Sequence, residues 1–326
     1  MAPDMTEANQ PVLAIFGPTA SGKSAVAEAV ADRVPAEIVS ADSMQVYRGL
    51  PVLTNQPVRP TRLVAIWGLD HEASVGEYAE LAHQAVDEAL TEGITPLVVG
   101  GTGLYFRAAL VDLDLPPAPQ LGARPRFEEL YDRLGPEQAY ALLAERDPLA
   151  AETVHANDRK RVVRALELAD AGESLARSPS RLWTRETRHP TLVFGLDVPK
   201  EVLAARIEAR VRGMFEHRVE EEVARAAAGP LSSTTAQVIG LREIRELPRE
   251  EATTAIVRRT LQYAAYQRKW MRRIPGLVPL AAEHAPAKVA EALLAAAYER
   301  FTLLGQQEEG ASGTRKGETD HTGHPV

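Results

Sequence analysis

Apolar residues gather in short runs along the first third of the chain, and each run closes on glycine or polar residues. Three of these runs have the length of a strand, at residues 12–16, 37–40 and 96–99. Two longer stretches of helical character lie between them, at 24–34 and 75–91. Strands that alternate with helices in this way are typical of β-α-β units, whose strands are parallel.

A fourth strand-like run, at 192–197, follows too far after the third for a single crossover, because most connections are short. The interval opens with a proline-rich break at 113–125 and then reads as helical from 127 to 173. We therefore predict a helical insertion domain at 116–188. It divides an α/β core into a first part at 1–115 and a second part at 189–305.

The second part of the core is predicted to be mainly helical after its strand, with helices at 200–228 and 249–273. From Gln306 onward the chain is polar, rich in Gly, Ser and Thr, and without apolar anchors. Such a composition does not bury enough apolar surface to order a chain. The sequence therefore predicts a disordered tail over 306–326.

The segment between the first strand and the next helix fits the phosphate-loop pattern G-x-x-x-x-G-K-[ST]. Its members are Gly17, Pro18, Thr19, Ala20, Ser21, Gly22, Lys23 and Ser24. Backbone N–H groups turn into one hollow there, Lys23 supplies a mobile cation, and the Ser24 hydroxyl is suited to Mg²⁺. The pattern predicts a P-loop NTPase-like parallel sheet with flanking helices, but it does not identify the molecule that carries the polyphosphate.

Asp42 directly follows the second strand, at the sheet edge where open α/β proteins bind their ligands. Three roles compete for this carboxylate: a magnesium contact, a general base, or the N-cap of a helix. The next residues, up to Gly49, add an amide, a phenol and a guanidinium within a few positions. Together with the carboxylate, these donors and acceptors are able to hydrogen-bond to the edge of a nucleobase.

Composition narrows the class of protein. Of 326 residues, 45% are hydrophobic and 25% are charged, as in ordinary soluble domains, and the lack of cysteine excludes disulfides and thiolate chemistry. Neither a secretory signal nor a run of about 18 apolar residues is present, so we expect a cytoplasmic protein without a membrane contact. The net charge of -8 argues against non-specific coating of nucleic acid, but it does not exclude a local basic groove.

The phosphate loop and the segment around Asp42 resemble motifs of the tRNA dimethylallyltransferase (tRNA isopentenyltransferase) family. The segment SADSMQVYRGL at 40–50, together with GPTASGKS, carries most of the resemblance. Weaker blocks follow in the family's order, at 98–105, 147–148, 155–161, 164–167, 237–240 and 262–270, so the resemblance covers about 11–273. It implies transfer of a dimethylallyl group from dimethylallyl diphosphate to the N6 amine of the adenosine 3′ of the tRNA anticodon, with release of pyrophosphate. The expected partners are tRNA and dimethylallyl diphosphate, with Mg²⁺ as cofactor, and we expect a monomer.

The resemblance also implies catalytic roles. The phosphate loop holds the leaving group, and Asp42 is the general base, which accepts a proton as the new C–N bond gives the nitrogen positive character. Thr102 matches a threonine near the bridging oxygen of the diphosphate. Arg206 and Arg210 lie one helical turn apart, and the family uses one arginine here; the sequence leaves open which one, and a solvated helix face competes for both.

The substrate base has to leave its stack to reach such a pocket. Ser43, Gln45 and Tyr47 are the local candidates to hold it, although Tyr47 fits a core aromatic equally well. More diffuse tRNA contacts are predicted at two places, where solvated charged faces are the alternative. They are Gln262, Gln267 and Lys269 on the late helix, with a structural role open for Gln267, and Arg159, Lys160, Arg161 and Arg164 in the insertion.

The chain also departs from the family pattern. Gln56 replaces a lysine in the run that usually reads G-T-A-K-P, and Arg218 stands where the family has glycine. In the block that usually reads T-R-Q-Y-A-K-R-Q, Ala265 and Tyr266 replace two cations. These changes spare the chemistry, so we expect them to affect tRNA choice or affinity rather than the type of reaction.

Three other functions fit parts of the sequence. An adenylate isopentenyltransferase uses the same donor with free AMP, but the helical insertion and its basic clusters favour RNA. A P-loop small-molecule kinase would use Asp42 for magnesium or substrate. A nucleotide-binding module without chemistry is disfavoured, because the sequence shows no second nucleotide motif.

Overall fold

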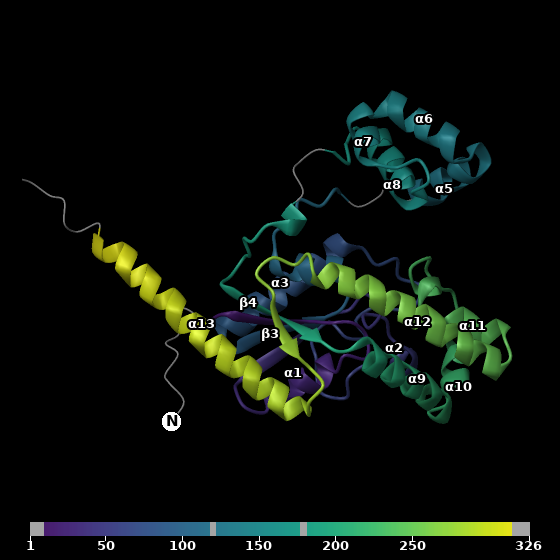
Figure 1. The fold of residues 1–326 in the computed structure, drawn as a ribbon. Helices are drawn as coiled ribbons and strands as arrows, with labels where there is room; N and C mark the ends of the chain where they lie inside the picture. Colours follow the sequence, from purple (N-terminus) through teal and green to yellow (C-terminus); the bar gives the residue numbers. More distant parts are fainter. Residues whose placement is uncertain (1–9, 118–121, 177–180, 315–326) are drawn as a thin grey trace, which may run out of the picture.

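A five-stranded parallel sheet organises the core of the molecule (Figure 1). The computed structural model describes residues 10–117, 122–176 and 181–314. The strands are β1 (Val12–Phe16), β2 (Ala36–Ala41), β3 (Thr95–Gly100), β4 (Thr191–Asp197) and β5 (Val278–Ala281), in the spatial order β2-β3-β1-β4-β5. The α/β fold and its first four strands are confirmed. β5 was not predicted, because it has only four residues and alternate positions are exposed.

Helices cover both faces of the sheet. In the central strand, Leu13 and Ile15 belong to one apolar cluster, and Val12, Ala14 and Phe16 belong to the other. This alternation follows from the two-residue period of a strand. The first face packs against α1 (Lys23–Ala31), α9 (Lys200–Glu216), α12 (Arg249–Met271) and α13 (Pro286–Thr314), and the second against α3 (Val75–Thr91) and α4 (Gly103–Leu110). Shorter helices complete the core: α2 (Pro51–Thr54), α10 (Val219–Ala227), α11 (Leu241–Glu246), η1 (Arg181–Trp183) and η2 (Thr235–Gln237).

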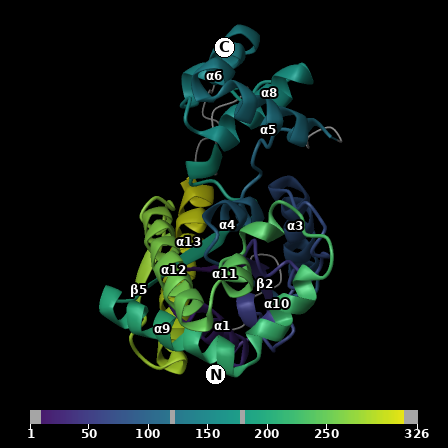
Figure 2. The same ribbon diagram turned by 90° about the vertical axis from the view of Figure 1, so that its right-hand side faces the viewer.

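The stretch predicted to be helical forms a lobe of its own, which Figure 2 shows above the sheet core. Its helices are α5 (Ala123–Leu134), α6 (Pro136–Arg146), α7 (Pro148–Thr153) and α8 (Arg159–Asp170). They bury a separate apolar cluster that includes Phe127, Leu143 and Leu166. A second apolar core explains why this region folds outside the sheet rather than against it.

The predicted disordered tail is wrong over its first part. Helix α13 continues through 306–314, and the remainder of the tail lies outside the described residues. The helix packs its earlier turns against α1, and a helix that is already formed needs no new nucleus, so it continues through the good helix formers at 306–309 and past Gly310. Among the described residues, no helix is long and apolar enough to cross a membrane.

The register of the sheet brings three loops together. Ala41, Gly100 and Phe16 are partners in neighbouring strands, so the chain leaves β2, β3 and β1 at one level. The fit is tight at this edge, since a Cβ on Gly100 would collide with the carbonyl of Ala41. The phosphate loop, the Asp42 loop and the loop after β3 therefore start side by side, as the strand order predicts for a ligand site.

Candidate functional site

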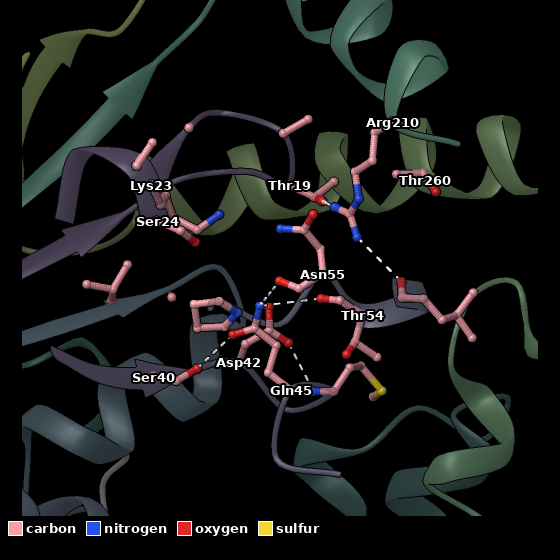
Figure 3. A pocket seen from close by; sticks show the side chains of 18 of the residues that line it. Thr19, Lys23, Ser24, Ser40, Asp42, Gln45, Thr54, Asn55, Arg210 and Thr260 are labelled. Atoms are coloured by element: carbon pink, nitrogen blue, oxygen red, sulfur yellow. Dashed lines mark hydrogen bonds between the residues drawn. The ribbon is translucent and has the colours of Figure 1, made fainter. Parts of the chain in front are cut away.

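A cavity of about 550 Å³ opens at this edge of the sheet. Its walls come from the phosphate loop, the end of β2, α2, α9 and α12 (Figure 3). The volume is typical of small-molecule sites, which span about 300–1,000 Å³. Five of the residues expected at the centre of the site share this cavity: Lys23, Ser24, Asp42, Arg206 and Arg210.

The phosphate loop has the backbone geometry of an anion cradle. Gly22 takes φ 92° directly before α1 begins at Lys23, so the helix N-terminus faces the cavity. Only glycine adopts this conformation without strain. Thr19, Ala20 and Gly22 line the wall, whereas Gly17, Pro18 and Ser21 lie behind it and shape the turn, with a hydrogen bond of 3.2 Å from Ser21 N to Pro18 O.

Lys23 is a half-buried cation that faces the cavity. Its Nζ donates to the Pro18 carbonyl at 2.9 Å. Burial lowers the pKa of Lys23 to about 8; the carboxylate of Asp42 opposes this shift, and the guanidinium of Arg210 adds to it. Two cations held close together in a desolvated pocket are stabilised by an anion placed between them.

We expect the affinity of this pocket for a polyphosphate to fall as the pH rises above about 8. Below that pH Lys23 carries its proton before the ligand arrives; above it, binding has to take up a proton from solution. Calorimetry with inorganic pyrophosphate at pH 7 and 9, in buffers of different ionisation enthalpy, measures both the affinity and the proton uptake.

The matched control for this titration is Lys23→Met, which removes the ionising group. Pyrophosphate itself titrates, so the result is the difference between the wild type and this variant. Equal proton uptake by both proteins at pH 9 would show that Lys23 is not the group concerned.

Arg210 and Arg206 both reach the cavity from α9, but their settings differ. Arg210 donates to Thr19 Oγ1 at 2.7 Å and more weakly to the Leu53 carbonyl at 3.5 Å. Its Nε is buried without a hydrogen-bond partner among the described residues, and burial lowers its pKa. Within the described residues the Arg206 side chain makes two hydrogen bonds, both long at 3.5 Å, to the carbonyls of Ser21 and Ala282. An unsatisfied buried donor favours Arg210 as the main anion contact.

Asp42 lies across the cavity from Arg210, with the Asn55 amide between them (Figure 3). Its Oδ1 accepts from Met44 N at 3.0 Å, which fixes the side chain in an Asx turn. The following residues form turns rather than a helix, so the N-cap role does not apply. One carboxylate oxygen is thus held by the backbone, and Oδ2 has no hydrogen-bond partner in the described part of the chain.

Thr102 ties the Asp42 loop to α12. It accepts from Ser43 N at 3.2 Å, and its hydroxyl lies 3.3 Å from both Ser43 Oγ and the Tyr263 hydroxyl. Tyr263 lines the cavity, and burial raises its pKa, so the phenol keeps its proton. Sequence reasoning missed Tyr263 because the helical period put it on the apolar side of α12, which is correct for the ring but says nothing of the hydroxyl.

The base-reading role is not supported for Tyr47. The residue is fully buried in the core, and its hydroxyl has no partner among the described residues. Gln45 does line the cavity, and its amide donates to the Asn55 carbonyl at 2.8 Å. Gln56, which replaces the family's lysine, donates to the Tyr47 carbonyl at 2.7 Å and so holds the Asp42 loop without adding a charge.

Gln267 is a structural residue, and its predicted contact with tRNA is wrong. It is 2% exposed, and both ends of its amide are used within the protein. Oε1 accepts from Thr19 N at 2.7 Å, and Nε2 donates to the Gly101 carbonyl at 2.9 Å. Buried amides need such partners. Gln267 therefore connects the phosphate loop, through Thr19, to the loop after β3.

Two of the four cations in the predicted basic cluster of the lobe are paired with carboxylates. Arg159 pairs with Asp132 at 2.7 Å, and Arg164 pairs with Glu167 at 3.0 Å, so both stabilise the lobe itself. Lys160 donates to Gln237 of the core at 2.7 Å. Arg161 is exposed, as are Gln262 and Lys269 on α12, and these three keep a surface that tRNA is able to reach.

One side of the cavity is apolar, which sequence reasoning did not foresee. This wall consists of Leu53, Val211, Met214, Val238, Ile239 and Ile256. The residues come from four separate segments, so no local pattern marks them as one surface. The cavity thus combines a cationic end, a carboxylate and a hydrocarbon wall.

Magnesium fits this donor set only together with a ligand. No group of three or more His, Cys, Asp or Glu side chains is arranged for a metal within the described ranges. Mg²⁺, however, usually takes one or two protein oxygens and completes its shell with phosphates and water. Ser24 and Asp42 offer a hydroxyl and a carboxylate in the same cavity.

Comparisons with known proteins agree with this picture. The IPP transferase family model matches residues 45–274, and the isopentenyl transferase model matches residues 10–63. A tRNA dimethylallyltransferase of Anaeromyxobacter dehalogenans is 39% identical over 84% of this chain and 93% of its own. A tRNA dimethylallyltransferase of Streptomyces coelicolor is 36% identical over 81% of this chain and 88% of its own.

Two solved structures also resemble the chain. The tRNA isopentenylpyrophosphate transferase of Bacillus halodurans has a TM-score of 0.66 at 27% identity, covering 91% of this chain and all of its own. A eukaryotic dimethylallyltransferase acting on tRNA has a TM-score of 0.71 at 25% identity, and the match covers 84% of this chain and 74% of the other.

Proposed function

The chain belongs to the tRNA dimethylallyltransferase family, and from this premise we propose how its cavity moves a dimethylallyl group from dimethylallyl diphosphate to the N6 amine of the adenosine 3′ of the tRNA anticodon. The enzyme is a prenyltransferase that modifies tRNA. The observation that carries the proposed mechanism is the placement of Asp42 opposite Lys23 and Arg210 across one cavity with an apolar wall.

The diphosphate lies in the phosphate loop, where backbone N–H groups, Lys23 and Arg210 surround it. When the allylic C–O bond breaks, its electron pair leaves with pyrophosphate, and these groups stabilise the growing negative charge. Ser24 is the residue that would hold Mg²⁺, which would neutralise phosphate oxygens when bound, and Asp42 stays available as the base. The apolar wall keeps water from the allylic carbon and gives the dimethylallyl group a surface of matching chemistry.

The adenine base enters from the side of Asp42. Its exocyclic nitrogen forms the new C–N bond and becomes positively charged, and its proton then passes to the carboxylate. Thr102 and Tyr263 form the hydroxyl pair beside this point and hold the Asp42 loop in place through Ser43. A base inside a stacked loop does not reach this depth, so the nucleotide has to flip out.

The test is product analysis with separate substrates. Purified protein is incubated with dimethylallyl diphosphate and either unmodified tRNA or AMP, and separately with ATP. We expect prenylated adenosine in tRNA nucleosides and no transferred phosphate. Prenylation of AMP alone, or ATP turnover without prenyl transfer, would overturn the proposal in favour of a free-nucleotide enzyme or a kinase.

We extend the proposal to a monomer that works in the cytoplasm, as the sequence predicts. Sedimentation of the purified chain with and without tRNA measures the stoichiometry. A stable dimer in both samples would contradict the monomer without affecting the chemistry.

A further inference from the structure

The C-terminal end of α12 carries an aromatic cluster that the mechanism above does not use. The rings of Trp183 and Trp270 lie 4.9 Å apart, and the Tyr266 ring meets Trp270 edge to face at 6.4 Å. The guanidinium of Arg273 lies 3.8 Å above the ring of Trp183. Three rings and a cation thus form one continuous group between the core and η1.

This cluster is held in place by buried contacts. Arg107, 1% exposed, donates to the carbonyls of Leu182 at 2.8 Å and Thr184 at 2.7 Å, on either side of Trp183. Trp270 packs so closely on α4 that a Cβ on Gly103 would collide with its ring. Burying a guanidinium is costly, and among the described residues carbonyl groups are its partners, which indicates that the position of Trp183 matters.

The outer surface of the cluster is open to solvent. The Tyr266 side chain is 54% exposed, and Arg273 is exposed. Within the described residues the Arg273 guanidinium makes no ion pair and lies over the Trp183 ring. A rigid, exposed aromatic ring beside an unpaired guanidinium matches the chemistry with which proteins hold single-stranded RNA.

The location also points to RNA. Tyr263 lines the catalytic cavity. Tyr266 follows it by three residues on the same helix. This spacing places the two residues about 4.5 Å apart along the helix axis and on neighbouring sides of the helix. Tyr266 therefore presents its ring about one helical turn beyond a residue of the cavity wall.

We propose that Tyr266 stacks an unpaired nucleobase of the anticodon loop next to the modified adenosine, and that Arg273, oriented by Trp183, contacts the adjoining phosphate. This inference rests on the proposed tRNA substrate. It adds that the Tyr266 contact depends on stacking rather than on charge, because a ring accepts any base face and releases no counterions.

Equilibrium binding of unmodified tRNA, measured over a series of salt concentrations, tests the stacking. Tyr266→Ala is expected to weaken binding by about 5- to 100-fold, the usual loss for one stacked base, and to leave the salt slope unchanged. Tyr266→Phe and Tyr266→Trp keep the ring and should bind as the wild type does. Tyr298→Ala is the matched control, since Tyr298 on α13 is 53% exposed and far from the cluster in sequence.

Two further variants separate stacking from charge. Arg273→Gln should lower the salt slope by about 0.7, the value for one phosphate contact on a single strand. Tyr266→Arg should recover affinity relative to Tyr266→Ala, but with a steeper salt slope. The KM for dimethylallyl diphosphate should stay unchanged in all variants, since the cluster lies outside the diphosphate end.

The outcomes are distinguishable. If the wild type prenylates tRNA but Tyr266→Ala binds it equally well, or if Tyr266→Phe fails to restore binding, the stacking inference is overturned while the proposed function stands. If the wild type neither binds nor prenylates tRNA, both are overturned.

Discussion

Replacing Asp42 with asparagine lowers the turnover of tRNA prenylation by about 10²–10⁴-fold, the usual contribution of a general base, and leaves dimethylallyl diphosphate binding largely intact. The carboxylate accepts the proton of the alkylated amine, whereas an amide of the same shape does not. The position of the side chain should survive, because the bond from Met44 N needs only an oxygen acceptor. Single-turnover rates at saturating tRNA, together with calorimetric titration of the donor, measure the two effects separately.

The experiment should be done at pH 7, because the Asp42 carboxylate also raises the pKa of Lys23. Without that carboxylate the pKa of Lys23 falls below about 8, and at higher pH the donor site would lose its cation as well. Asp70→Asn serves as the matched control, since Asp70 is exposed and does not line the cavity. If Asp42→Asn instead abolishes donor binding at pH 7, Asp42 acts mainly as a magnesium contact.

Local patterns predicted the parts of the site that depend on local geometry. The phosphate loop lies between β1 and α1, and Asp42 lies at the end of β2, as the motif and the strand periodicity require. The open choice between Arg206 and Arg210 needed the structure, because helical spacing puts both on one face. Only the contacts to Thr19 and the unpartnered Nε distinguish Arg210.

The wrong predictions about the site share one physical cause, which is contact with segments distant in the sequence. Tyr47 and Gln267 have side chains suited to RNA, but the fold encloses both, and Gln267 finds its partners far away in sequence, at Thr19 and Gly101. In the lobe, Arg159 loses its free charge to Asp132, on another helix. A sequence pattern reveals which residues carry charge, but not which charges are already paired.

A departure from the family pattern was, in contrast, informative. Arg218 takes φ 60° where the family has glycine, so the chain keeps the left-handed turn before α10 at some conformational cost. The replacement at Tyr266 affects the surface rather than the backbone, since it removes a charge and adds an exposed ring. Departures at exposed positions near the site thus point to substrate contacts, whereas those at turns point to backbone geometry.

Replacing Arg210 with methionine is expected to lower kcat by about 10²–10³-fold, the usual loss when one preorganised donor to a developing anion is removed. Its Nε is buried without a partner among the residues that the structure describes, and its Nη1 is fixed on Thr19, so the guanidinium is oriented before the pyrophosphate charge appears. Removing a desolvated cation from beside Lys23 should also raise the pKa of Lys23, since Arg210 lowers it, and leave the melting temperature unchanged or higher.

Arg206→Met is the comparison that decides between the two arginines. Its contacts are 3.5 Å long, so a smaller loss of kcat is expected. Arg210→Lys should recover little, because a single ammonium does not reproduce the fork that reaches both Thr19 and the ligand. Pre-steady-state release of pyrophosphate, measured for all three variants with saturating tRNA, reports the chemical step directly. A greater loss for Arg206→Met than for Arg210→Met would reverse the assignment and place the diphosphate nearer to Ser21 and Ala282.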